Sequence, residues 1–171
     1  DQGYERSKYE LGRMYYRGQG VERNFEKAIE FWEPLADGGM ADAQASLAYM
    51  YERGEGREKD LNRAVRLYAE AAAQGQSDAL QNLAVIYASG RGTERDYRKA
   101  HELWEPLAEE GDDDAQFGLG LLYFNGRGVP RYLETAYMWV YLSAEAGNVF
   151  AIEGCEEMER LMLSGQVEHA K

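Results

Sequence analysis

The sequence repeats itself every 36 residues along nearly its whole length, and the copies align without a gap. Each copy places a leucine, a tyrosine four residues later and then two glycines at matching positions. The aligned leucines and tyrosines are Leu11, Leu47, Leu83 and Leu119, and Tyr15, Tyr51, Tyr87 and Tyr123. Repeats of roughly 20–50 residues are typical of solenoids, in which each copy buries its apolar face only by stacking on its neighbours. The periodicity therefore predicts a solenoid.

Each copy predicts two helices joined by a tight turn. In the first helix of the second copy, Ala43, Leu47, Met50 and Tyr51 recur at the spacing of one helical face. We expect Gly54 to end this helix, because the residue after a helix often adopts the left-handed conformation that glycine tolerates best. Polar side chains stand where the second helices should begin, and their oxygens can accept hydrogen bonds from exposed backbone N–H groups. These expected caps are Asn24, Asp60 and Asp96.

The second helices carry two further signals. The first and third copies share the segment Trp-Glu-Pro-Leu-Ala, which places Pro34 and Pro106 inside predicted helices. Proline lacks a backbone N–H, so we expect each helix to bend at this point and then to continue. In the second copy, Gly75 is expected to end the helix in the manner of Gly54.

Together these features predict an all-α fold, a right-handed α/α superhelix of four antiparallel helix pairs in a single domain over residues 1–171. The pairs are expected at about residues 5–40, 41–76, 77–112 and 113–148. After Asn148 one more apolar helical face follows, but no glycine turn. We interpret residues 149–171 as a capping helix and a short terminal helix that begins after Ser164, because solenoids need capped ends.

The repeated motif carries a family resemblance. The pattern Ala-x-x-x-Leu-(Gly/Ala)-x-x-Tyr-x-x-Gly-x-Gly, then Ala-x-x-(Leu/Phe/Trp)-(Trp/Tyr)-x-x-x-Ala-x-x-Gly, resembles the Sel-one-like repeat family, a relative of tetratricopeptide repeats. This resemblance implies an adaptor or scaffold role, since members serve in protein quality control, polysaccharide export and bacterial interaction with hosts. A cysteine-rich subclass has been linked to penicillin binding, but this chain has one cysteine, so that activity is not carried over.

The resemblance also implies where a ligand would bind. In tetratricopeptide-like solenoids the first helix of each repeat lines the concave surface, through positions that point away from its own core stripe. In the N-terminal half these positions are aromatic and cationic, and in the C-terminal half they are interpreted as apolar. The candidate ligand-binding residues are Tyr9, Arg13, Tyr16, Arg17, Tyr49, Arg53, Asn82, Phe117, Leu121 and Phe124.

These candidates suit a peptide with acidic and apolar anchor residues. The arginines would meet carboxylates with bidentate geometry, and the tyrosines would supply rigid contact area. Phe117, Leu121 and Phe124 would hold an apolar anchor, and Asn82 could bond to peptide backbone. Two structural alternatives remain open at this point. The phenylalanines could pack against the capping helix instead, and the arginines could pair with nearby acids.

The sequence offers no set of residues for catalysis or cofactor binding. The four Gly-x-Gly turns lack the following lysine and the preceding strand of a nucleotide-binding loop. His101 has no second histidine or cysteine near it in sequence, and Cys155 occupies a core leucine position, so we expect no metal. The acidic cluster from Glu109 to Asp114 lacks the spacing of a calcium loop. We therefore expect neither an enzyme nor a cofactor.

Charge and hydropathy limit the classes of partner that the chain is expected to bind. The formal net charge of −12 disfavours nucleic acid and anionic membrane surfaces. The longest apolar run, from Ala136 to Ala144, is too short to span a membrane.

The leading interpretation is a scaffold that binds a peptide or protein. The alternatives are a structural component that self-associates in a larger envelope complex and, least favoured, a hydrolase related to the cell wall. The family resemblance and the missing initiator Met suggest a bacterial periplasmic or secreted protein, with the cytoplasm as the alternative.

Overall fold

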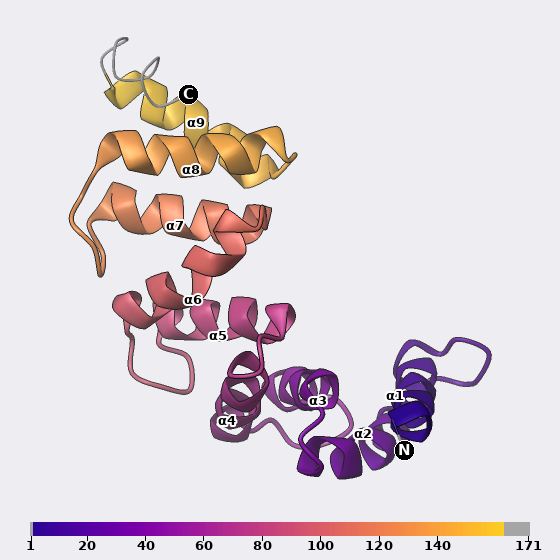
Figure 1. The fold of residues 1–171 in the computed structure, drawn as a ribbon. Helices are drawn as coiled ribbons and strands as arrows, with labels where there is room; N and C mark the ends of the chain where they lie inside the picture. The colour runs from indigo at the N-terminus through magenta and orange to yellow at the C-terminus, as the bar shows by residue number, and fades with distance from the viewer. Residues whose placement is uncertain (1, 163–171) are drawn as a thin grey trace. The chain divides into compact units, whose positions relative to one another are not determined.

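A computed structural model describes residues 2–162, and this part of the chain contains nine helices and no strand (Figure 1). The all-α, helical-repeat fold class predicted from the sequence is confirmed. The expected terminal helix after Ser164 lies outside the described residues. The helices are α1 (Gln2–Arg17), α2 (Phe25–Asp37), α3 (Ala41–Arg53), α4 (Leu61–Ala72), α5 (Ser77–Ser89), α6 (Tyr97–Glu109), α7 (Asp113–Asn125), α8 (Leu133–Glu145) and α9 (Val149–Leu161).

The described chain separates into two compact units. The N-terminal unit comprises the residues up to Leu83 together with Arg91–Thr93, and the C-terminal unit comprises Ala84–Gly90 and the residues from Glu94 onwards. In the C-terminal unit, α9 packs on α8, because Ala151 and Met158 join a buried cluster with Ala136, Tyr137 and Val140. Figure 1 shows α7, α8 and α9 following one another in chain order within this unit.

The helix starts follow the capping prediction. The side chains of Asn24, Asp60 and Asp96 accept hydrogen bonds from backbone N–H groups in the first turns of α2, α4 and α6. The cap of α8 differs, because Tyr132 stands in that position and makes no side-chain cap hydrogen bond. Three of the four Gly-x-Gly turns are therefore followed by a helix with a capping side chain, and the last is not.

In the second repeat, the predicted glycine ends the first helix but not the second. Gly54 closes α3 in the left-handed conformation, with φ 73°, as expected. In the second helix, however, α4 ends at Ala72, and Gly75 adopts φ +80° two residues after the cap residue Ala73, which is itself right-handed. The reason is that the N–H groups of Gly75 and Gln76 bond back to the carbonyls of Ala72 and Ala71, which satisfies the helix end.

The two proline-containing helices continue through the proline. In both, a side chain from the next helix bonds to the last turn. Pro34 lies inside α2 and Pro106 inside α6. In both cases a glutamine from the next helix donates to a carbonyl of the last turn, Gln44 to Ala36 O at 3.3 Å and Gln116 to Ala108 O at 3.0 Å. The proline-free helices α4 and α8 are followed instead by apolar Leu80 and Ile152 at the aligned positions. The glutamine therefore accompanies the Trp-Glu-Pro-Leu-Ala segment.

The middle residue of the Gly-x-Gly turn links consecutive repeats in the N-terminal unit. Glu55, between Gly54 and Gly56, accepts a hydrogen bond from the Tyr16 hydroxyl in α1 at 3.0 Å. One repeat later, Arg91 forms an ion pair with Glu52 in α3, with Nη2 and Oε1 3.1 Å apart. Tyr16 and Glu52 are themselves 36 residues apart, so each of these turn residues contacts the same position of the preceding first helix.

The leucine that repeats along the chain is not buried everywhere. Leu47 in α3 is 1% exposed, whereas Leu11 at the aligned position of α1 is 41% exposed. The difference has a physical reason, because α2 packs against α3 and no described helix precedes α1. The shared sequence pattern therefore predicts burial only for helices that have a neighbour on both sides.

Candidate functional site

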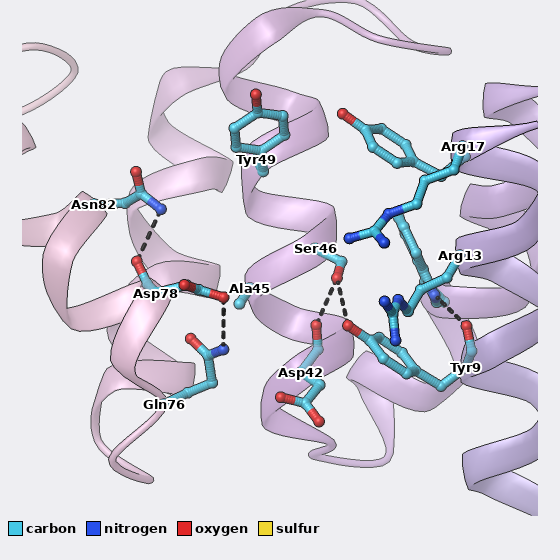
Figure 2. A pocket seen from close by; sticks show the side chains of 12 residues that line it. Tyr9, Arg13, Arg17, Asp42, Ala45, Ser46, Tyr49, Gln76, Asp78 and Asn82 are labelled. Atoms are coloured by element: carbon cyan, nitrogen blue, oxygen red, sulfur yellow. Dashed lines mark hydrogen bonds between the residues drawn. The ribbon is translucent and has the colours of Figure 1, made fainter.

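A pocket of about 390 Å³ opens on the first helices of the N-terminal unit (Figure 2). Most of its lining comes from α1, α3 and α5, with one residue from α2 and one from the turn before α5. The lining residues are Tyr9, Arg13, Tyr16, Arg17, Trp32, Asp42, Ala45, Ser46, Tyr49, Gln76, Asp78 and Asn82. The volume lies at the low end of the range of small-ligand sites, so the pocket suits a few residues of a partner.

Trp32 forms the aromatic base of this pocket. Its indole N–H donates to the backbone carbonyl of Tyr9 at 3.1 Å, which fixes the ring. The rings of Tyr9 and Tyr16 each lie 5.8 Å from Trp32 between centroids, within the range of favourable aromatic pairs. Gly12 permits this contact, because a Cβ at that position would lie 2.3 Å from the indole nitrogen. The aromatic lining is therefore packed into place before any ligand arrives.

The tyrosine hydroxyls are held by neighbouring elements. The Tyr9 hydroxyl lies 3.1 Å from Ser46 Oγ on α3, and the Tyr16 hydroxyl donates to Glu55. Burial raises the pKa of Tyr9, although its hydrogen bond with Ser46 acts in the opposite direction. Burial, followed by the hydrogen bond to Glu55, raises the pKa of Tyr16 to about 12. Both hydroxyls are therefore neutral groups at physiological pH.

The pocket lining carries both signs of charge. Arg13 and Arg17 come from α1, and Asp42 and Asp78 come from the first turns of α3 and α5. In Figure 2 the two guanidinium groups lie on one side, Gln76, Asp78 and Asn82 lie on the other, and α3 runs between them. The combination of aromatic rings and both signs of charge suits recognition of a polar segment with an apolar part.

The charged side chains differ in how far they are already paired. Arg13 Nη1 lies 3.1 Å from both carboxylate oxygens of Glu10, so Arg13 already has an ion-pair partner within α1. Arg17 is exposed, and no other side chain in the described part of the protein forms an ion pair or hydrogen bond with it. Arg17 is therefore the cation of this pocket that is available to a ligand.

The structure brings together six of the ten candidates. Tyr9, Arg13, Tyr16, Arg17, Tyr49 and Asn82 all line the pocket. Arg53 does not line it, because its guanidinium forms an ion pair with Glu55 at 3.0 Å and lies over the Tyr49 ring. It holds Tyr49 from outside the pocket.

The other three candidates belong to the C-terminal unit. Phe117 and Phe124 pack against the buried cluster of α8 and α9, which is the structural alternative raised from the sequence. Leu121 is 39% exposed. An apolar ligand anchor on these residues stays a prediction.

Several lining residues were not among the candidates. Trp32 lies on a second helix and Gln76 in a turn, so a search of first-helix positions could not find them. Asp42 and Asp78 lie on first helices, but acids in a first turn are expected anywhere because they favour the helix dipole. The close approach of Trp32 to Gly12 depends on the folded arrangement, so the sequence carried no signal for it.

Residues 2–162 contain neither a candidate metal site nor a candidate membrane span. No group of histidine, cysteine, aspartate and glutamate side chains in this range could hold a metal ion. Among the same residues, no helix is both long enough and apolar enough to cross a membrane.

The helix pairs, with a pocket on the first helices of the N-terminal unit, define a helical-repeat protein. The Sel1 repeat family model matches residues 6–40, 41–76, 77–112 and 113–148. The chain belongs to the Sel1 repeat family, which confirms the resemblance seen in the sequence. Sel1 repeat proteins are generally protein-interaction scaffolds, and the family is typically non-catalytic.

Solved structures agree with this assignment. The chain is similar to a protective antigen from uropathogenic Escherichia coli with an SLR fold, at 32% identity and a TM-score of 0.86 over 92% of this chain. It is also similar to a Sel1 repeat protein from Oxalobacter formigenes, at 30% identity and a TM-score of 0.82 over 90% of this chain. The chain spans 34% of the antigen and 62% of the Oxalobacter protein.

A more distant structure supports the fold alone. A putative Sel1 repeat protein from Klebsiella pneumoniae matches 91% of this chain and 93% of its own, at 19% identity and a TM-score of 0.55. A comparison with curated protein sequences gave no significant match.

Proposed function

We propose that the N-terminal unit binds a short peptide segment of a partner protein in the pocket formed by α1, α3 and α5. The observation that carries this proposal is the combination of a buried tryptophan base, fixed tyrosines and an unpaired arginine in one pocket. Aromatic residues and arginine are the side chains that most often dominate the energy of protein interfaces. Rings that are already fixed lose little conformational entropy when a ligand binds.

The polar lining suits a peptide backbone. Asn82 donates through its amide nitrogen to the carbonyl of Asp78, and within the described residues its amide oxygen keeps free acceptor capacity. Gln76 Oε1 accepts from the backbone N–H of Ala79 and thereby caps α5. Side chains held in this way can accept or donate hydrogen bonds to a chain laid across them without being reordered.

Selection from a displayed library of random 12-residue peptides tests the proposal. The intact chain should enrich peptides that also bind it in solution, measured by fluorescence anisotropy of the labelled synthetic peptide. Arg17→Glu and Tyr49→Ala should each weaken this binding by about tenfold, because one pocket contact of about 1.4 kcal/mol is lost or reversed. Thermal unfolding of both variants should stay close to that of the wild type.

Arg66→Glu is the matched control. Arg66 is an exposed arginine on α4 that does not line the pocket, so the same change of charge should leave the affinity unaltered. Equal weakening by Arg17→Glu and Arg66→Glu would indicate a general charge effect. Unchanged binding in both pocket variants would place the peptide elsewhere and overturn the proposal.

A further inference from the structure

We infer that the pocket selects a segment carrying both signs of charge, with its acidic group next to Arg17 and its basic group next to Asp42 and Asp78. This inference rests on the proposed function and specifies the chemistry of the partner. It differs from the expectation drawn from the sequence, which predicted acidic and apolar anchor residues in the partner and no basic one.

The acidic group of the ligand follows from the state of the two arginines. Arg13 already shares its charge with both oxygens of Glu10. Arg17 stands in the last turn of α1, and no described residue forms an ion pair with it. A carboxylate that enters the pocket therefore finds one guanidinium with its donors free, and such charge-assisted hydrogen bonds are among the strongest that side chains form.

The basic group of the ligand follows from the acids of the pocket, Asp42 on α3 and Asp78 on α5. The carboxylate of Asp42 accepts no hydrogen bond from any described residue, and its backbone carbonyl accepts from Ser46. Among the described residues, the carboxylate of Asp78 receives only a long contact of 3.4 Å from Gln76 Nε2, beyond the usual hydrogen-bond range of about 2.7–3.2 Å. The helix dipole favours acids at these first-turn positions, but it leaves their oxygens free to accept from a ligand.

The two signs of charge in the lining exclude ligands of a single charge. A wholly acidic segment that reached Arg17 would also place carboxylates near Asp42 and Asp78, and like charges brought together in an interface cost binding energy. A wholly basic segment would meet the same penalty at Arg17. A segment with one group of each sign satisfies Arg17 and the two aspartates, so the pocket should read the order of charges along the peptide as well as their presence.

The experiment uses the same displayed library with the intact chain and two variants. Peptides enriched by the wild type should carry an acid and a base together more often than the unselected library does. Arg17→Glu should remove the preference for the acid and retain that for the base. The double variant Asp42→Asn and Asp78→Asn should remove the preference for the base, and asparagine keeps the shape of each side chain.

A charge exchange gives the sharper readout. For the most enriched synthetic peptide, replacing its acid by lysine should weaken binding to the wild type by about tenfold. The Arg17→Glu variant should then bind the lysine-substituted peptide more tightly than it binds the original acidic peptide. CD spectra and thermal unfolding establish that each variant is folded.

The outcomes separate this inference from the function on which it rests. Enriched peptides that are acidic only, with affinity unchanged in the double asparagine variant, would overturn the charge pairing and leave peptide binding in this pocket intact. An absence of enriched peptides, or binding that no pocket variant affects, would overturn both.

Discussion

The same three positions of a first helix serve different purposes in the two units. Tyr9, Arg13 and Tyr16 of α1 align with Phe117, Leu121 and Phe124 of α7, 108 residues later. In α1 these side chains line the pocket. In α7 the two phenylalanines pack against the cluster of α8 and α9.

The polar end of each side chain accounts for this difference. The hydroxyls of Tyr9 and Tyr16 bond to Ser46 and Glu55, which belong to the next repeat, and this holds the rings at the surface of the unit. Phenylalanine has no such group and gains most by joining an apolar cluster. A repeat position therefore sets the direction of a side chain, and the polar atoms around it decide whether it remains available to a ligand.

The largest expected effect tests whether the two units can be destabilised separately. Gly56 has φ +72°, and a Cβ at this position would lie 2.9 Å from the backbone carbon of Phe25. Gly56→Ala should destabilise the N-terminal unit by about 3 kcal/mol, through the left-handed backbone and the clash. Gly128→Ala, 2.6 Å from the backbone carbon of Tyr97, should do the same to the C-terminal unit. Hydrogen exchange measured by mass spectrometry would locate each loss of protection.

Gly75→Ala serves as the control for these two variants. Gly75 has φ +80°, but an added Cβ would meet no atom within 4 Å. The expected cost is therefore only about 1–2 kcal/mol, from the backbone conformation alone. Equal losses in Gly75→Ala and Gly56→Ala would show that close approach in the turn contributes nothing.

The next effect concerns the role of Phe117. Because this ring packs on the cluster of α8 and α9, Phe117→Ala should destabilise the C-terminal unit by about 2 kcal/mol, less than for a fully buried phenylalanine. Denaturant unfolding monitored by CD would measure the loss. The matched variant Leu121→Ala, at a side chain 39% exposed, should cost less than about 1 kcal/mol. A larger cost for Leu121→Ala would reverse our assignment of the packed position.

A smaller effect concerns the caps. Asn24→Ala should destabilise α2 by about 1 kcal/mol, because Asn24 Oδ1 accepts from the backbone N–H of Lys27 at 2.8 Å. Tyr132→Asn should stabilise α8 by up to about 1 kcal/mol, because no side chain caps that helix. Thermal unfolding of the two variants and of their combination would measure both changes. A destabilising Tyr132→Asn would show that the Tyr132 ring contributes more than a cap.

Tyr16→Phe is expected to have the smallest effect on stability at neutral pH. In alkaline solution its stability should differ from that of the wild type in its dependence on pH. The pKa of Tyr16 is raised to about 12 in the folded protein, from an ordinary value of 10.0. Below pH 10 the hydroxyl is protonated in both states, and its contribution to stability is complete. Between pH 10 and 12 the unfolded chain releases this proton while the folded chain keeps it, so stability falls.

Denaturant unfolding across this pH range would test the assignment. The Tyr16→Phe variant should lose stability less steeply between pH 10 and 12 than the wild type. Identical slopes for Tyr16→Phe and the wild type would remove the proposed link between Tyr16, Glu55 and stability.

Much of the fold could be predicted because it depends on local chemistry that recurs. The spacing of Ala43, Leu47 and Tyr51 defines a helical face, and Asn24 and Asp60 mark helix starts whatever lies around them. The exposure of Leu11 could not be predicted in this way. Whether this position is buried depends on a neighbouring helix and not on the repeat itself.

The site was predictable only in part, for a related reason. Helical geometry identified the positions of Tyr9, Arg13 and Arg17, since side-chain direction follows from sequence spacing. It could not reveal that Glu55 draws Arg53 out of the pocket, because this ion pair depends on the path of the turn. Nor could it show that Glu10 would pair with both Arg6 and Arg13, while Arg17 has no ion-pair partner among the described residues.

The turn residues that contact the preceding repeat restrict how repeats of this kind can be recombined. Glu55 fits a tyrosine at position 16, and Arg91 fits a glutamate at position 52. A tandem duplication of residues 41–76 would place a second copy of Glu55 opposite Glu52, where two carboxylates would repel each other. A duplication of residues 5–40 would place Gln19 opposite Tyr16, a neutral and compatible pair. At each junction the turn residue must therefore match the residue that it contacts in the preceding repeat. Repeats with nearly the same pattern of core residues and glycines are not interchangeable modules.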